Sequence, residues 1–388
     1  MSSGRERAGA DAFLYGLLWD LERYCTTVRE RLGAADGDQE VRDQALDAYQ
    51  VVEGIRREVR LLLADPDLGT PDLQPNYHQL YRRWREGVAL VESYPLLFVE
   101  RYSASDRQMT RLCRRIAEQV RWPLAPPLVA TFSTQYYWTV TAFNVVCAPA
   151  TEGTTLLSLP DLLHELGHIL LLHHEAALVG DFVQEIATYI AREQRRIDTQ
   201  QRPPHYRSLY DDLFAHWRSP WLREFVADMV ATYLCGSAFG WQHVRLCASV
   251  SRAAYAPTLG EASDHPADEA RLRGIVAVLQ RVGDDAAQAR VRDVWERYRT
   301  MSGETQPSDY EVCYPQELIN SLAERVVDGC RSLGLRGVND TPATPDALLA
   351  LINEAWERFQ ADPEHYGDWE YARLRALWED LGVADGRP

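Results

Sequence analysis

Residues 162 to 174, LLHELGHILLLHH, bring four of the chain's ten histidines into one apolar run with helical periodicity. His164 and His168 stand four residues apart, so a helix projects both imidazoles from one face, about one turn from each other. Two neutral imidazoles at this spacing can bind one Zn²⁺ ion, and the adjacent carboxylate of Glu165 can reach a water molecule on the metal. Gly167 removes a side chain close to the expected metal position. The pattern HExxH therefore predicts a zinc centre.

A catalytic zinc ion needs a third protein ligand and an open position for water. His174 stands at the third-histidine spacing of the pattern HExxHxxGxxH, in which the helix turns out at a glycine, but here that residue is Leu171. The helix is therefore expected to run on and to carry His173 and His174 away from the metal. Glu185, in DFVQEIATYI, lies near the distance of a short-spaced glutamate ligand but lacks the usual Glu-x-x-x-Asp arrangement.

A second acidic candidate has that arrangement. The stretch WLREFVADMVATY places Glu224 and Asp228 one helical turn apart. Glu224 can complete the metal site, while Asp228 accepts a hydrogen bond from the far nitrogen of a ligand histidine and so fixes its tautomer. An ordinary acidic face on an amphipathic helix would also explain the pair. Because it follows HExxH on a separate predicted helix, we prefer Glu224 as the third ligand and keep Glu185 as the alternative.

A third stretch, ASDHPADEARLRGI at residues 262 to 275, contains His265 and Pro266, followed by Arg271. The proline at a helix start and the acidic residues in the first turn are typical of a helix N-terminus. Read by itself, the stretch is explained by a histidine that caps a helix.

Together, HELGH at 164 to 168, EFVAD at 224 to 228 and HPADEAR at 265 to 271 resemble the motifs of one family. This is the HtpX and CAAX-prenyl-protease family of gluzincin metallopeptidases. The resemblance implies that the zinc ligands are His164, His168 and Glu224. It further implies a catalytic carboxylate at Glu165, a supporting carboxylate at Asp228, and two residues near the active-site cleft, Arg271 and His265, the latter a candidate for stabilising the tetrahedral intermediate.

The match covers roughly residues 130 to 275, and the chain departs from the family in two respects. Thr141, Ala142 and Phe143 stand where the family often has Asn-Ala-Phe on the strand that borders the cleft. The best-known members are embedded in membranes, whereas no stretch here approaches the apolar length of a membrane span. The resemblance therefore implies a soluble relative, and prenylated or membrane substrates do not carry over.

The elements that must position these residues are mostly helical. Apolar residues recur at three- and four-residue spacing before residue 120 and again after 161, apart from the break DPDLGTPDLQPN. The runs PPLVATF, YYWTVTAFNVVCA and TTLLSLP are typical of strands. We therefore expect a mostly α fold with a small β-sheet (α+β). A zincin-like core at 101–275 lies between an N-terminal helical region at 1–100 and a C-terminal helical region at 276–388.

Composition limits the partners and the compartment. Arginine supplies all 41 positive charges, and the formal net charge of −16 argues against nucleic acid and against an anionic membrane surface. The seven cysteines are odd in number and never form a CxxC pair, which suits buried thiols in a reducing compartment. The N-terminus has no uninterrupted apolar core of the signal-peptide type. We expect a cytoplasmic protein.

The predicted chemistry is zinc-assisted hydrolysis of a peptide bond in a peptide or protein substrate. Glu165 acts as general base, and His265 helps to hold the oxyanion. An extended peptide can pair with an exposed strand from residues 128 to 158. Two other hypotheses stand. One is a metal-binding regulatory protein with little proteolysis, which binds a protein partner through its C-terminal helices. The other is a helical scaffold in which HELGH is coincidental, and it predicts no bound metal.

Overall fold

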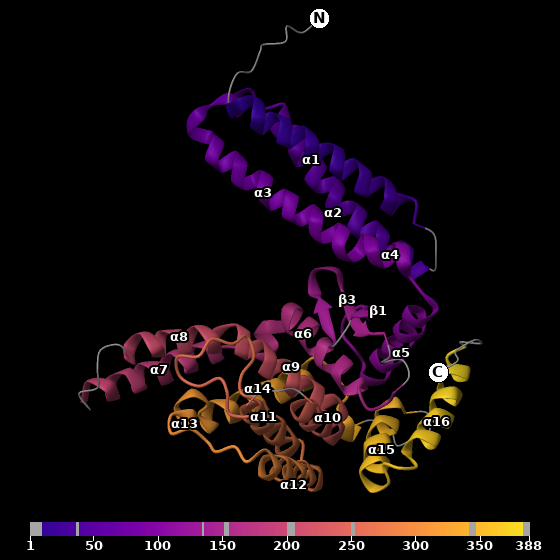
Figure 1. The fold of residues 1–388 in the computed structure, drawn as a ribbon, viewed down its shortest axis with the longest axis vertical. Helices are drawn as coiled ribbons and strands as arrows, with labels where there is room; N and C mark the ends of the chain where they lie inside the picture. Colours follow the sequence, from indigo (N-terminus) through magenta and orange to yellow (C-terminus); the bar gives the residue numbers. More distant parts are fainter. Residues whose placement is uncertain are drawn as a thin grey trace, which may run out of the picture. The chain divides into compact units, whose positions relative to one another are not determined.

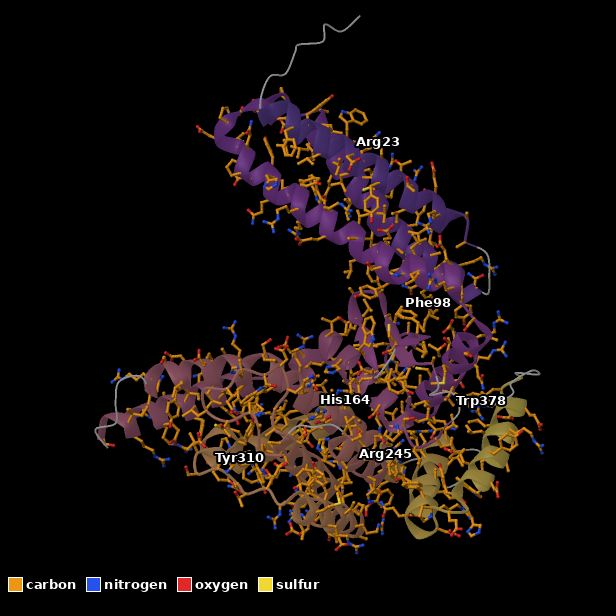
Figure 2. All side chains as sticks on the ribbon, viewed as in Figure 1. Arg23, Phe98, His164, Arg245, Tyr310 and Trp378 are labelled. Carbon is orange, nitrogen blue, oxygen red and sulfur yellow. The ribbon has the colours of Figure 1, made fainter. Side chains whose placement is uncertain are left out.

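The computed structural model describes residues 10–35, 39–133, 136–150, 155–199, 206–249, 253–340 and 347–382. The chain divides into two compact units, Met1–Ala104 and Ser105–Pro388. Figure 2 labels Arg23 and Phe98 in the first unit, and His164, Arg245, Tyr310 and Trp378 in the second. Among the described residues, no helix has both the length and the apolar character needed to cross a membrane.

The first unit is a bundle of helices that pack along their lengths (Figure 1). Its helices are α1 (Ala10–Gly33), α2 (Gln39–Leu63), α3 (Gln74–Val91) and α4 (Leu97–Arg101). The predicted break between α2 and α3 forms two short 3-10 turns, Pro66–Gly69 and Pro71–Leu73, each with proline at its start, where a backbone N–H is not required. The α1 side chains that pack inward recur at three- and four-residue spacing: Leu14, Leu18, Leu21, Cys25, Val28 and Leu32.

The second unit begins with α5 (Ala104–Val120, its first residue in unit 1) and a small mixed sheet. The strands are β1 (Leu128–Ser133), β2 (Trp138–Val140) and β3 (Val145–Pro149), in the order β1-β3-β2. β1 runs parallel to β3 and β2 runs antiparallel to it, so β2 forms one edge of the sheet. Between β2 and β3 the chain turns at Asn144, whose positive φ of 52° suits asparagine.

The remaining elements of the second unit are helices (Figure 1). They are α6 (Leu159–Leu178), α7 (Phe182–Thr199), α8 (Tyr206–Arg218), α9 (Pro220–Cys235), α10 (Ser237–Ser249), α11 (Asp268–Arg281), α12 (Asp285–Ser302), α13 (Tyr310–Cys313), α14 (Gln316–Ser332), α15 (Leu348–Ala361) and α16 (Tyr366–Asp380). The prediction of a mostly α fold with a small β-sheet is confirmed. The predicted regions 101–275 and 276–388 share one hydrophobic core, in which α14 packs on α6, α9 and α11.

One predicted strand is wrong. In TTLLSLP, none of the described residues 155–160 is in a strand, and α6 begins at Leu159. Ser158 is the N-cap of this helix, and Pro160 occupies its first turn, where the missing N–H costs no hydrogen bond. The leucines that suggested a strand, Leu156 and Leu157, are buried as the chain enters the helix.

Helices α6 and α9 approach each other closely at a glycine. A Cβ atom on Gly167 would lie 2.7 Å from the Cα and 2.9 Å from the carbonyl oxygen of Ala227, which is too close for any side chain. The backbone of α9 therefore fills the space that the missing side chain leaves. Ala227 lies between Glu224 and Asp228, so this approach sets the separation between the α9 carboxylates and the α6 histidines.

Candidate metal centre

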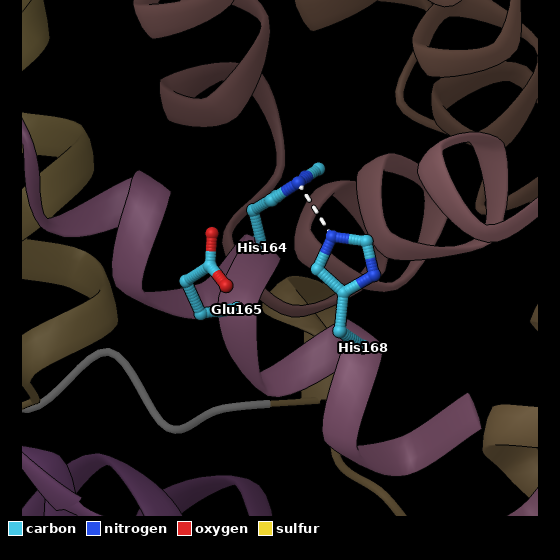
Figure 3. A group of neighbouring side chains, drawn as sticks. All are labelled: His164, Glu165 and His168. Carbon is cyan, nitrogen blue, oxygen red and sulfur yellow. Dashed lines mark hydrogen bonds between the residues drawn. The ribbon is translucent and has the colours of Figure 1, made fainter. Parts of the chain in front are cut away.

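Three side chains from two helices converge on one point beside a cleft. The Nε2 atoms of His164 and His168 lie 3.1 Å apart (Figure 3). The carboxylate of Glu224 approaches both rings, with Oε2 at 3.6 Å from His164 Nε2 and Oε1 at 3.5 Å from His168 Nε2. In a tetrahedral zinc site with bonds of 2.0 to 2.1 Å, ligand atoms are about 3.3 Å apart. The spacing and the chemistry of these donors therefore fit a zinc ion.

A buried ion pair between Arg271 and Asp228 contacts His164 at Nδ1, the ring nitrogen that does not face the expected metal position. Arg271 on α11 donates two hydrogen bonds to Asp228, from Nε to Oδ2 at 2.7 Å and from Nη2 to Oδ1 at 2.7 Å. Asp228 is fully buried, and its Oδ1 lies 2.8 Å from Nδ1 of His164, within hydrogen-bonding distance. A carboxylate at Nδ1 leaves the lone pair of Nε2 directed at the metal position. Arg271 thus acts on the centre through Asp228.

Glu165 stands next to this centre without being one of the three convergent ligands. Its carboxylate lies beside the ring of His164 (Figure 3), and one ligand atom of each of His164, Glu165 and His168 lies within 4.8 Å of the others. The residue is buried, with 5% of its surface exposed, yet it lines the cleft. Burial raises the pKa of Glu165 to about 7. A carboxyl group that titrates near neutral pH suits a general base.

The two histidines differ in their readiness to bind a proton. Burial disfavours charge on both rings, but Asp228 and Glu224 raise the pKa of His164 above its usual value. Burial, together with the charge of its neighbour His164, lowers the pKa of His168. A metal ion needs neutral imidazoles, so metal binding displaces the proton that His164 holds in the metal-free chain.

His265 lies at the rim of the cleft, with 49% of its side chain exposed and its Nδ1 atom 3.0 Å from Oε2 of Glu224. The preceding loop fixes its backbone: Ser263 Oγ accepts a hydrogen bond from the N–H of His265, and the indole of Trp221 donates to the carbonyl of Ser263. The cap of α11 is Ala267, without a side-chain hydrogen bond. His265 therefore does not cap the helix, and its ring contacts the proposed ligand instead.

The alternative ligands lie apart from the centre. Glu185 on α7 accepts hydrogen bonds from Ser321 (2.6 Å) and from Arg325, both on α14. α6 continues to Leu178, as expected from the run of leucines, with one non-helical residue at His174. His173 is exposed. The structure thus brings Glu224, and not Glu185, to the two histidines.

The cleft has a volume of about 1200 Å³ and belongs wholly to the second unit. One side comes from the edge strand β2, with Trp138 and Thr139, and the others come from α6, α9 and α10. Sequence reasoning missed α10, which has no recognisable motif. Phe239 of this helix stacks on the His164 ring, with centroids 6.0 Å apart and planes inclined by 10°. Gln242 and Arg245 of the same helix also line the cleft.

Comparison with protein-family models, with curated proteins and with solved structures finds no match for this chain. The three sequence motifs, and the geometry in which their residues meet, are therefore the features of this chain that point to a function.

Proposed function

We propose that this chain is a zinc-dependent metallopeptidase of the gluzincin type, similar in its site to the HtpX and CAAX-prenyl-protease family. One observation carries the proposal: His164, His168 and Glu224 present their ligand atoms to one another at 3.1 to 3.6 Å, beside a cleft that Glu165 also lines. All three residues are of types that bind zinc, and the spacing of their ligand atoms is that of a tetrahedral zinc site.

Each residue then has a chemical task. A zinc ion held by His164, His168 and Glu224 would act as a Lewis acid toward water and a peptide carbonyl. Glu165 takes a proton from the attacking water and passes it to the leaving amine. The exposed ring of His265 donates a hydrogen bond to the oxygen on which negative charge develops. Asp228 and Arg271 hold His164 in the orientation that the ligand set requires.

The shape of the cleft supports a peptide or protein as substrate. Among the described residues, β2 pairs with a strand on one side only, and its residues Trp138 and Thr139 line the cleft. An extended peptide can add to such an edge strand through backbone hydrogen bonds, while its side chains enter neighbouring pockets. This arrangement would lay the peptide along the β2 side of the cleft.

We further propose that the protein works in a reducing compartment such as the cytoplasm. All seven cysteines are buried free thiols. Disulfides are the usual device of proteins in oxidising compartments, and buried thiols suit a compartment that keeps them reduced. The net charge of −16 continues to argue against nucleic acid as a partner.

The test is the metal content of purified protein, measured by mass spectrometry for the wild type and for two matched variants. We expect about one zinc ion per chain in the wild type and a sharp fall in Glu224→Ala. Glu185→Ala is the matched control, because that carboxylate pairs with α14 instead, and it should keep its zinc. A wild type that stays free of metal after zinc is supplied would contradict the proposal.

A further inference from the structure

The wall of the cleft carries a pair of side chains that the proposed hydrolysis does not use. Asp161 lies in the first turn of α6, and Gln242 lies on α10; both line the cleft. The amide nitrogen of Gln242 donates a hydrogen bond to Oδ2 of Asp161. This bond orients the amide, because only its NH₂ group can donate to a carboxylate. The carbonyl oxygen of Gln242 is therefore left as an acceptor.

That acceptor has no partner. Gln242 is only 5% exposed, and among the described residues nothing donates a hydrogen bond to its buried Oε1 atom. Buried polar atoms are satisfied in the great majority of proteins, so an open acceptor in the wall of a cleft calls for a donor from outside the chain. The missing group is an N–H or O–H donor.

The neighbouring carboxylate, Asp161, accepts its hydrogen bond from a neutral group. No ion pair between residues that the structure describes includes Asp161, whose hydrogen-bond partner is the neutral amide of Gln242. Burial raises the pKa of Asp161 to about 6, because the Gln242 amide and the more distant charges of His164, Arg245 and Arg271 lower it by less than burial raises it. An acidic residue in the first turn of a helix is favourable by itself, because it faces the positive end of the helix dipole. That explanation accounts for Asp161 but not for the open acceptor beside it.

Asp161 and Gln242 lie close to the proposed general base, Glu165. Asp161 precedes Glu165 by four residues on α6, so the two carboxylates lie on neighbouring turns of one helix face, and both line the cleft. A substrate group that reaches Asp161 therefore belongs to a residue close to the bond that Glu165 serves.

We propose that Asp161 and Gln242 form a subsite for a positively charged, hydrogen-bond-donating side chain of the substrate, a guanidinium or an ammonium group. This inference rests on the proposed function, because it assigns a substrate class to the same cleft. A guanidinium group carries several N–H donors in one plane and no acceptor, so it can donate to the carboxylate of Asp161 and to Oε1 of Gln242 at once. One guanidinium group would then supply both the positive charge beside Asp161 and the hydrogen-bond donor for Oε1 of Gln242.

The positive charge of Arg245 in the same cleft favours a different substrate, one with an acidic side chain. Arg245 follows Gln242 by three residues on α10, is exposed, and lines the same cleft without an ion pair to Asp161. If Arg245 instead governed recognition, the cleft would prefer acidic substrate side chains. The experiment therefore includes both charges.

The experiment measures peptide binding by fluorescence anisotropy in the Glu165→Gln background, which prevents cleavage during the titration. The probes are labelled heptapeptides of alanine and tyrosine in which one position, scanned along the peptide, carries arginine, citrulline or glutamate. Citrulline has the shape of arginine without its charge. At one position we expect the arginine peptide to bind about tenfold more tightly than the citrulline peptide, the size of one charge-assisted hydrogen bond.

Two variants identify the residues responsible. Asp161→Asn keeps the shape and should abolish the tenfold difference, whereas Arg245→Gln should retain it; circular dichroism checks that both are folded. Equal binding of arginine and citrulline at every position, an unchanged difference in Asp161→Asn, a preference for glutamate that Arg245→Gln removes, or no binding of any probe would each overturn the subsite.

The zinc content of the same samples separates this inference from the proposed function. Bound zinc without any preference for arginine would reject the subsite and leave the metal centre standing. A preference that depends on Asp161 in protein that binds no zinc would support the subsite and reject the metallopeptidase.

Discussion

Each unit of the chain contains a network of charged side chains, and the two networks differ in how their atoms are paired. In the first unit, Glu22 on α1 accepts hydrogen bonds from Arg56 at 3.3 Å and from Arg60 at 2.8 Å, both on α2. Arg56 also donates to Glu53 at 2.8 and 2.9 Å. Every carboxylate in this network faces a donor.

In the second unit, the charged network surrounds His164 and differs between the two sides of its ring. Arg271 donates two hydrogen bonds to Asp228 on one side of His164. On the other side, Nε2 of His164, Nε2 of His168 and the carboxylate of Glu224 face one another, with only the proton of His164 between them. Such a convergence is unfavourable until a cation or a proton occupies it. In the first unit each carboxylate pairs with an arginine between two packed helices. In the second unit Glu224 also has charged neighbours, His265 and Arg271, but it lies with two histidines beside a cleft, and we therefore propose that this network serves a ligand.

The largest difference should appear in catalysis. Glu165→Gln removes the proton acceptor while keeping the side-chain shape, so hydrolysis of a peptide substrate should fall by a factor on the order of 10² to 10⁴, with zinc content unchanged. The matched variant in the first unit, Glu22→Gln, should leave both zinc content and hydrolysis intact. Activity that survives in Glu165→Gln would exclude the general-base role.

The next largest effect concerns stability. Arg271→Gln removes the guanidinium that donates two hydrogen bonds to the buried carboxylate of Asp228 and should lower the free energy of unfolding by about 3 to 5 kcal/mol. Arg60→Gln removes an arginine whose side chain is 56% exposed, and Glu22 keeps Arg56 as a partner, so the loss should stay below about 1 kcal/mol. Urea titrations of both variants measure the two values. Equal losses would mean that the networks are energetically alike.

Metal binding should stabilise the folded chain by an amount that depends on the zinc concentration. A zinc concentration a thousandfold above the dissociation constant adds about 4 kcal/mol, and a hundredfold excess about 2.7 kcal/mol. Differential scanning calorimetry with and without a chelator measures the corresponding shift in melting temperature. The shift should vanish in His168→Ala and persist in Glu53→Gln of the first unit. A shift of the same size in His168→Ala would place the metal elsewhere.

The smallest predicted effects compare two helical glycines. Gly167→Ala puts a Cβ atom against the α9 backbone at Ala227, should cost about 1 to 3 kcal/mol, and should weaken zinc binding by about tenfold or more as Glu224 moves away. Gly54→Ala on α2 meets no atom within 4 Å and should stabilise the chain by about 0.5 to 1 kcal/mol. Unchanged zinc affinity in Gly167→Ala would show that the close approach of the helices does not set the ligand geometry.

Much of the candidate site could be predicted before the structure, because the relevant information is local. The i, i+4 spacing of His164 and His168 places both rings on one helix face whatever the helix packs against. The spacing of Glu224 and Asp228 works in the same way within α9, and the mixture of short strands and long helices follows from the period of the apolar residues. The strand predicted at TTLLSLP failed because a short leucine-rich run fits a strand and a helix start equally well, and Pro160 suits the first turn of a helix.

What the sequence by itself determined is therefore the composition of each helix face: two histidines and a glutamate on α6, a glutamate and an aspartate on α9. Only the tertiary structure decided that these faces meet. Gly167 lets the α9 backbone come within van der Waals reach of α6, and this approach brings Glu224, but not Glu185, within 3.6 Å of both histidines. The contribution of α10 could not be predicted either. Phe239 and Gln242 carry no motif, and their roles arise from packing between helices distant in sequence, which periodicity within one helix does not encode.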